Sequence, residues 1–332
     1  MRRVSPLIVF VLSAAVVAGA GIRLARDGDV IAEGTGLGGA WVGAILVAAA
    51  TSLPELATDI NAVLLEAPDL AVGDLFGSSM ANLLILAVAD QCTRNPRMLT
   101  RVAMNQGLVG VLGITLAALA ALGIVTTGLM PRIALGWAPL TIVAVYLAGI
   151  RLLHLNRAAP PFRQPAQVEA RPSQQRLRRA AIGFAIAAIV ILVAAPYLAA
   201  SAAEIADRLG VSQGFVGALL LAITTSLPEA AVSVTSIRMG SYDLAVGNLL
   251  GSNCFNMAML LPLDLVYAGE PLLGSVAPGL AIGALAAIVM TSLALLDILN
   301  KSERRVWKLE PLPTAMIVTY LAGMFVLERA TG

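Results

Sequence analysis

The sequence predicts an all-α polytopic membrane protein whose ten transmembrane helices form two inverted five-helix repeats. Three observations lead to this fold class. Of the 332 residues, 58% are hydrophobic and 13% are charged, whereas soluble domains carry about 25% charged residues. The apolar residues are gathered into ten segments of about 20 residues or more, which is the length that crosses a bilayer. The two halves of the chain also share a long stretch of sequence.

The ten segments follow one another along the chain. In order, we expect them at about 5–25, 38–65, 70–90, 102–123, 131–151, 180–205, 212–237, 243–266, 273–298 and 312–329. The first follows Met1-Arg2-Arg3 in the manner of a signal peptide, but we expect a transmembrane helix because cleavage would remove one member of a symmetric set. The second and seventh segments contain the same Thr-Ser-Leu-Pro-Glu motif. The third and eighth begin near Asp69 and Asp243, which we expect to be helix N-caps. The other segments are predicted from their length and apolar content alone.

One sizeable polar segment, residues 152–179, separates the fifth and sixth helices. Its prolines and its low apolar content favour a linker over a folded unit. We therefore expect a first five-helix repeat at 1–151 and a second one at 180–332.

Basic residues predict the orientation in the membrane. Of the 22 Lys and Arg residues, 17 (22 − 5) lie in the linker or in the connections on the same side of the membrane. The five exceptions are Arg2, Arg3, Arg132, Arg208 and Arg329. By the positive-inside rule, residues 152–179 are cytoplasmic and both termini lie outside, in a multi-pass protein of the inner (plasma) membrane.

The internal repeat is the strongest organisational signal. Thr51-Ser52-Leu53-Pro54-Glu55 recurs 174 residues later as Thr225-Ser226-Leu227-Pro228-Glu229. Aligned at that offset, residues 48–86 and 222–260 are identical at 17 of 39 positions. Each half holds five helices, an odd number, so the second copy enters the membrane the other way up. In transporters, inverted repeats of this kind place a binding site near the bilayer midplane.

The repeated motif puts an ionisable group inside the membrane twice. A charged side chain at membrane depth costs about 2.5 kcal/mol or more, so Glu55 and Glu229 are expected to be functional. Thr51 and Ser52 precede Glu55 by four and three residues and therefore share its helix face. The equivalent residues of the second copy are Thr225 and Ser226.

The motif also contains a proline. Pro54 removes an amide donor and clashes with the carbonyl of Ala50, so we expect a break or kink that frees carbonyls near Ala48 to Ala50. Pro228 is expected to do the same for residues 222–224.

Each copy places a Ser and an Asn four residues apart on the next helix, where they share a face. They are Ser78 and Asn82 in the first copy and Ser252 and Asn256 in the second. Carboxylates, hydroxyls, amide oxygens and freed carbonyls make an all-oxygen set, which hard cations such as Ca²⁺ prefer. Two facing glutamates would balance one divalent ion and would repel each other without it. Competition from Na⁺ or a proton would then produce exchange.

Other metal chemistry lacks its usual ligands. The chain has one histidine, His154, and two cysteines, Cys92 and Cys254. Zinc and copper sites are therefore not expected, and no cofactor is expected either.

Two acids break the symmetry of the repeats. Asp59 stands where the second copy has Ser233, and Asp74 stands where it has Asn248. Asp59 lies one helical turn past Glu55. Each of the two acids either lines an ion pathway or stays solvated near the membrane surface.

These residues closely resemble the alpha-repeats of the sodium/calcium exchanger, or cation/Ca²⁺ antiporter, superfamily in its prokaryotic, two-repeat form. Two copies of Thr-Ser-Leu-Pro-Glu, each followed by G-[DN]-x-x-G-S-x-x-x-N, carry the resemblance, which covers effectively the whole chain. It implies a secondary antiporter, not an enzyme, that exchanges Na⁺ for Ca²⁺ by alternating access. Its partners would be inorganic cations and the lipid bilayer, with no nucleic acid and no obligatory protein partner.

The resemblance also implies roles for individual positions. Glu55 and Glu229 look like the paired carboxylates that ligate Ca²⁺ and share Na⁺ sites. Ala48 and Ala222 match positions whose backbone carbonyls bind Na⁺. The remaining ligands implied are Thr51, Ser52, Thr225, Ser226, Ser78, Asn82, Ser252 and Asn256.

The chain departs from the family pattern at the third and eighth helices. Members that resemble it have an Asp at one of the two positions held here by Asn82 and Asn256. Ser79 stands opposite Asn253, and Asp74 replaces a usual Asn. One fewer central carboxylate leaves the counter-ion open between Na⁺ and H⁺.

Two further classes of protein compete with an antiporter. A passive cation channel would need symmetric pore residues from an oligomer, whereas this chain carries both halves of one site. An intramembrane protease is suggested by Tyr242-Asp243 and Gly73-Asp74, but the GxGD form of that motif is absent.

Overall fold

A computed structural model describes residues 5–93, 98–126, 136–155, 172–208, 224–267, 270–300 and 310–331. Nine helical spans in these ranges are long and apolar enough to cross a membrane. They are α1 (Pro6–Thr35), the joined α2, η1 and α3 (Gly39–Trp41, Val42–Val47 and Ala48–Leu64), α4 (Pro68–Cys92), α6 (Asn105–Val125), α7 (Trp137–Leu155), α8 (Gln174–Arg208), α11 (Tyr242–Val266), η3 with α13 (Pro278–Leu280 and Ala281–Asn300), and α14 (Pro311–Thr331).

The seventh expected segment, 212–237, is described only from residue 224 onward, and this part contains α10 (Leu227–Arg238). Two short helices, α5 (Met98–Arg101) and α12 (Leu272–Ser275), follow α4 and α11. The expected linker, 152–179, lies mostly outside the described residues.

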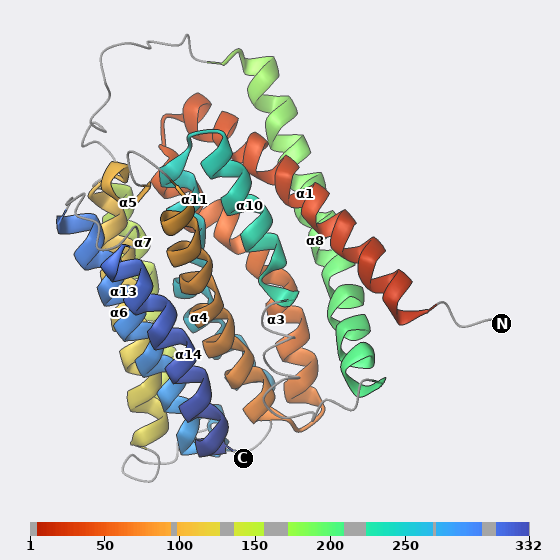
Figure 1. Cartoon of the computed structure of the whole chain (residues 1–332), viewed down its shortest axis with the longest axis vertical. Helices are drawn as coiled ribbons and strands as arrows, with labels where there is room; N and C mark the ends of the chain where they lie inside the picture. Colours follow the sequence, from red (N-terminus) through yellow and green to blue (C-terminus); the bar gives the residue numbers. More distant parts are fainter. Residues whose placement is uncertain are drawn as a thin grey trace.

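The first helix extends well beyond the apolar stretch that predicts it. It was expected at 5–25, but α1 continues to Thr35 and ends at Gly36, which has a φ of 71°. An ion pair joins the expected segment to the added turns, because Arg23 Nε donates to Asp27 Oδ2 at 2.6 Å. At 1.5 Å per residue, 30 residues span about 45 Å, longer than a hydrocarbon core of about 30 Å. Figure 1 shows α1 lying obliquely along α8, the helix against which it packs most extensively.

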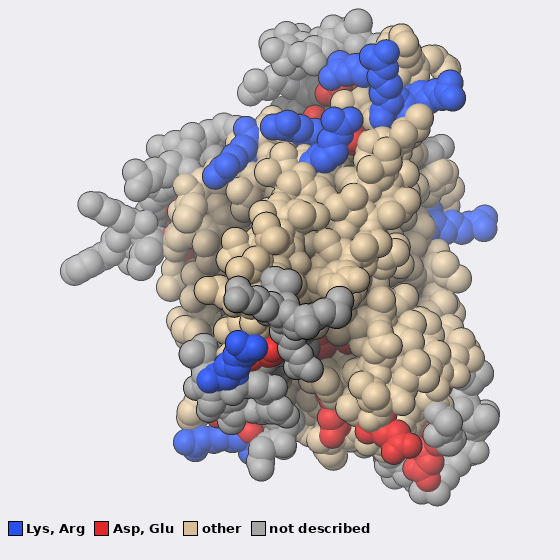
Figure 2. Space-filling model, turned by 90° about the vertical axis from the view of Figure 1, so that its right-hand side faces the viewer, with Lys and Arg blue, Asp and Glu red and all other residues tan. Residues whose placement is uncertain are grey.

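The helices divide into central and peripheral ones. In the most apolar 18-residue stretch, 78% of the residues of α4 and 67% of those of α11 are buried, against 22% for both α1 and α8. Large apolar side chains such as Leu12 and Ile189 are exposed on the peripheral helices. On the face formed by α1 and α8, uncharged side chains make a broad band, with most of the Lys and Arg gathered above it and with Asp, Glu and a few Lys or Arg below it (Figure 2). Such a band is the surface that a bilayer covers.

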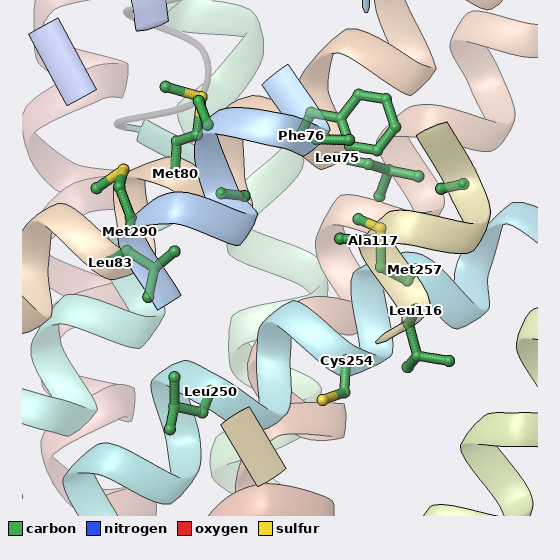
Figure 3. Close-up of a cluster of buried hydrophobic side chains, with 14 of the residues drawn as sticks. Leu75, Phe76, Met80, Leu83, Leu116, Ala117, Leu250, Cys254, Met257 and Met290 are labelled. Atoms are coloured by element: carbon green, nitrogen blue, oxygen red, sulfur yellow. The ribbon is translucent and has the colours of Figure 1, made fainter. Parts of the chain in front are cut away.

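The core lies where the central helices meet α6 and α13. Figure 3 shows Phe76 and Met80 of α4 in one cluster with Leu116 of α6, Met257 of α11 and Met290 of α13. Residues from both halves of the chain thus share one core, which fixes the two repeats against each other.

Two aspartates join the repeats by symmetric hydrogen bonds. Asp69 Oδ1 accepts a bond of 2.7 Å from the amide of Ala277, and Asp243 Oδ1 accepts one of 2.8 Å from the amide of Ala103. The two bonds are equivalent under the 174-residue offset, because Asp69 corresponds to Asp243 (69 + 174) and Ala103 corresponds to Ala277 (103 + 174). The expectation that Asp69 and Asp243 are helix N-caps is wrong, because neither helix has a side-chain cap and each carboxylate instead binds an amide of the other repeat.

A second symmetric pair of aspartates lies at the far ends of α4 and α11. Asp90 Oδ1 accepts the amide of Leu99 at 2.9 Å, and Asp264 accepts the amides of Leu272 at 2.6 Å and Gly136 at 2.7 Å. These bonds hold α5 and α12 against the ends of the central helices. The internal repeat therefore includes the aspartates that bind backbone amides at both ends of α4 and α11.

Of the break or kink predicted at Pro54, the break does not occur. The helix α3 runs continuously from Ala48 to Leu64, with Pro54 inside it. Membrane helices tolerate an interior proline because packed neighbours and Ser or Thr side chains compensate for the lost bond. The irregular turn lies earlier, in the π-helical segment η1 (Val42–Val47). In the second repeat, α10 begins at Leu227, directly before Pro228, so a helix end does occur there.

The segment η1 packs closely against α11 through glycines. A Cβ atom on Gly251 would overlap the backbone of Ala44, and one on Gly43 would come within 2.6 Å of the carbonyl oxygen of Leu244. Small residues allow this close approach between helix backbones in a membrane. The position of η1, and with it the start of α3, thus depends on these glycines.

We predict that Gly251→Ala separates η1 from α11 and destabilises the protein. Overpacking of this kind costs about 1–3 kcal/mol, which a thermal melt of the detergent-purified protein will detect as a lower midpoint. The control is Gly107→Ala, because no heavy atom lies within 4 Å of the Cβ position there. Equal melting midpoints for the two variants would contradict the packing described.

Candidate functional site

The two repeated glutamates lie on helices of opposite repeats, Glu55 on α3 and Glu229 on α10. Both are fully buried. Their carboxylates lie close enough to repel each other. Ser52 connects the two helices, because its Oγ donates to Glu229 Oε1 at 3.2 Å. Two acidic side chains are thus held away from water where the two repeats meet.

Hydroxyls form a symmetric pair of contacts around the glutamates. Thr51 Oγ1 lies 3.5 Å from Ser252 Oγ, and Ser78 Oγ lies 3.4 Å from Thr225 Oγ1. The two contacts are equivalent under the 174-residue offset (51 + 174 and 78 + 174). Each contact joins the Thr-Ser-Leu-Pro-Glu segment of one repeat to a central helix, α4 or α11, of the other repeat. Four of the hydroxyls predicted as ligands therefore meet across the two repeats.

The backbone carbonyl of Ala48 also faces this group, because Thr51 Oγ1 lies 3.2 Å from it and 3.1 Å from the carbonyl of Val47. Its counterpart, Ala222, lies outside the described residues. The carbonyl role implied for Ala222 stays a prediction.

Two asparagines link α4 to α11. Asn82 Nδ2 donates to Asn253 Oδ1 at 3.1 Å, and Asn253 Nδ2 donates to the backbone carbonyl of Ser79 at 3.1 Å. Asn253 appears in the sequence only as a departure from symmetry, yet the structure makes it the partner of a predicted ligand. Its contribution depends on a tertiary contact, which the repeat pattern does not indicate.

Several buried oxygens of the site have no hydrogen-bond partner among the described residues. They are Glu55 Oε1 and Oε2, Glu229 Oε2, Asn82 Oδ1, Asn256 Oδ1 and Ser226 Oγ. Buried acceptors without partners are costly, and buried charges are normally paired or bound to a metal ion. Carboxylate, amide and hydroxyl oxygens are the ligands that hard cations prefer. No group of three or more His, Cys, Asp or Glu side chains arranged to hold a metal occurs in the described ranges.

The two acids that break the symmetry are buried, with Asp59 0% and Asp74 6% exposed. Neither stays solvated. Both act electrostatically on Glu55. The structure therefore brings them into the neighbourhood of the central pair.

Some residues of the site have no counterpart among the sequence predictions. Asn248 Oδ1 lies 3.3 Å from Thr51 Oγ1, and Asn248 Nδ2 donates to Ser233 Oγ at 3.0 Å. Gln106 Nε2 donates to the carbonyl of Asp243 at 2.7 Å. The 174-residue offset signals Asn248 and Ser233, because they face Asp74 and Asp59 in the alignment. No comparable signal marks Gln106.

A model of the family described as sodium/calcium exchanger protein matches residues 5–152 and 179–327. The chain belongs to this family. The family is one of transporters, in agreement with the prediction that the chain is not an enzyme and that its partners are inorganic cations.

Curated relatives of this exchanger include inner membrane protein YrbG of Escherichia coli, which is 29% identical over 260 residues (75% of this chain and 76% of the relative). The putative antiporter CaxA of Alkalimonas amylolytica is 27% identical over 256 residues (74% and 76%). The sodium/calcium exchanger MaX1 of Methanosarcina acetivorans is 36% identical over 74 residues, 22% of this chain and 21% of the relative. The exchanger is thus a multi-pass membrane protein with an inner-membrane relative.

Solved structures of the sodium-calcium exchanger NCX_Mj share its fold. One of them superposes with a TM-score of 0.73 at 19% identity and covers 96% of this chain and 98% of the other. This likeness confirms the predicted fold class, ten transmembrane helices in two inverted repeats.

We predict that Ca²⁺ stabilises the purified exchanger. A bound ion removes the repulsion between Glu55 and Glu229, and a ligand at 100 times its Kd adds about 2.7 kcal/mol to the free energy of unfolding. Thermal melts in detergent with Ca²⁺ and with a chelator will measure the difference. The matched variant, Glu55→Gln with Glu229→Gln, should melt higher than the wild type in chelator and show a smaller shift of its midpoint with Ca²⁺. Equal wild-type midpoints with and without Ca²⁺ would contradict the assignment.

Proposed function

We propose that the protein is a secondary active antiporter that exchanges Ca²⁺ for Na⁺ by alternating access at a site between its two repeats. The observation that carries the proposal is the pair Glu55 and Glu229, buried on opposite repeats beside acceptor oxygens that lack partners. Membership of the sodium/calcium exchanger family supports it, as does the name of the relative MaX1.

The proposed ligands divide by chemistry. Glu55 and Glu229 supply the charge that neutralises a divalent ion. The hydroxyl and amide ligands are Thr51, Ser52, Thr225, Ser226, Ser78, Asn82, Ser252 and Asn256. The backbone carbonyls of Ala48 and Ala222 complete the set for Na⁺. No cofactor and no obligatory protein partner belongs to the proposal.

Charge explains why transport would be an exchange. With Ca²⁺ bound, the two carboxylates and the ion are neutral together, and the site can change its exposure from one side to the other. Without a cation the site is a buried double negative charge, whose transfer through a medium of low dielectric is strongly unfavourable. Na⁺ ions that replace Ca²⁺ restore neutrality on the return step. Each conformational change therefore requires an ion.

The same residues also support H⁺ as an alternative driving ion in place of Na⁺. Asn82 and Asn256 are both amides, so the site has fewer fixed charges to hold several Na⁺ ions. Protons on Glu55 and Glu229 would also neutralise the empty site. A Ca²⁺/H⁺ antiporter is therefore the alternative within the same fold.

Ca²⁺ uptake into proteoliposomes, with Na⁺, H⁺ and K⁺ gradients imposed separately, tests the proposal. We predict uptake that depends on an outwardly directed Na⁺ gradient, and none in Glu55→Gln or Glu229→Gln, because one missing carboxylate leaves the ion's charge uncompensated. The control is Glu328→Gln, an exposed acid near the end of α14. Uptake driven by a pH gradient alone would favour the proton alternative, and uptake without any counter-ion would favour a channel.

We also propose an inner-membrane location with residues 152–179 in the cytoplasm and both termini outside. The distribution of Lys and Arg and the inner-membrane relative support it.

Cysteine labelling tests this orientation. In a chain with Cys92 and Cys254 replaced, we predict that Ser173→Cys reacts with a membrane-impermeant maleimide only in inverted vesicles. Leu65→Cys, between α3 and α4, should react only in intact spheroplasts. The reverse pattern would overturn the orientation.

A further inference from the structure

The symmetry of the repeats fails at one pair of positions that touch each other. Asp59 follows Glu55 by one turn on α3, and Asp74 precedes Ser78 by one turn on α4. Both acids are more than nine-tenths buried, and none of their four carboxylate oxygens has a hydrogen-bond partner among the described residues. The two side chains face each other closely enough to interact directly.

The mirror positions in the second repeat form a closed, neutral contact. Asn248 Nδ2 donates to Ser233 Oγ at 3.0 Å and lies 3.3 Å from the backbone carbonyl of Glu229. Ser233 Oγ in turn lies 3.4 Å from the carbonyl of Ala245. These side chains satisfy one another, so this half needs no ion.

The two aspartates of the first repeat cannot satisfy each other in this way when both are ionised. Two ionised carboxylates are both acceptors and cannot donate to each other. The charged groups that act on the pair among the described residues are the two acids themselves and Glu55, and no Lys or Arg is among them. Glu55 is itself fully buried with both carboxylate oxygens unpartnered. Three buried acids therefore lie close together without a Lys or Arg acting on them among the described residues.

We propose that Asp59 and Asp74 form a second cation site, for a hard divalent ion of the Ca²⁺ class, beside the central site and on one side of it only. Carboxylate oxygens are the ligands that such ions prefer, and two of them balance a divalent charge. One helical turn, about 5.4 Å, separates these acids from Glu55 and Ser78 along their helices. An ion held here lies next to the central ligands.

The site gives the antiporter a built-in difference between its two faces, and this reading rests on the proposed function. In the proposed orientation, the connection between α3 and α4 faces outside, so the extra site lies on the outer approach to Glu55. The inner approach carries the neutral pair Ser233 and Asn248. Ca²⁺ arriving from outside would thus pause at a site that Ca²⁺ arriving from the cytoplasm does not meet.

The test is to give the first repeat the residues of the second, in the variant Asp59→Ser with Asp74→Asn. Equilibrium binding of radioactive Ca²⁺ to the full-length detergent-purified protein, in Na⁺-free buffer, counts the bound ions. We expect two Ca²⁺ per wild-type chain and one per variant chain. Glu229→Gln, which alters the central site alone, should also retain one.

Binding of equal numbers of Ca²⁺ to the wild type and to the double variant would overturn the proposal. A wild type that binds one ion, lost in Glu229→Gln, would overturn it as well. Asp59→Asn with Asp74→Asn, which keeps the side-chain volumes, provides a second variant if the first is not monodisperse. Because binding is measured without transport, two bound ions in a protein that moves no Ca²⁺ would reject the proposed function and retain the second site.

Discussion

The repulsion between two carboxylates buried on opposite repeats is the constraint on which the rest of the structure depends. Glu55 and Glu229 lie away from water, within a core shared by both halves of the chain. Such a pair is unfavourable unless a cation or a proton lies between them. The neighbouring hydroxyls and amides are neutral groups and supply no countercharge. In this view the stability of the centre and the transport of an ion have the same physical cause.

The inverted repeat explains how so small a set of residues builds a site between two halves. Hydroxyl contacts occur twice, Thr51 with Ser252 and Ser78 with Thr225. Aspartates at both ends of α4 and α11 fix backbone amides, so these central helices hold their neighbours in place. The first repeat departs from this symmetry in charge, because Asp59 and Asp74 stand where the second repeat has Ser233 and Asn248. This difference makes the two approaches to the centre chemically different.

Much of this arrangement follows from the sequence, because it depends on local pattern. Ten apolar segments of spanning length and one constant offset predict the fold, and the offset alone pairs Glu55 with Glu229. The π-helical turn before Ala48 was not predicted, because it depends on the contact of Gly43 and Gly251 with the facing helix. The bond from Asn82 to Asn253 and the partners of Asp69 and Asp243 also lie on distant segments. Sequence periodicity shows which face a residue occupies, and not which atom it meets.

The central claim is that one cation lies between the two repeats, bound by both glutamates. A crystal structure of the Ca²⁺-loaded protein, with anomalous difference density for the ion, tests it most directly. The account predicts a peak about 2.3–2.6 Å from carboxylate oxygens of both Glu55 and Glu229. A Ca²⁺ peak coordinated by residues of a single repeat, with the two glutamates apart and unliganded, would contradict it.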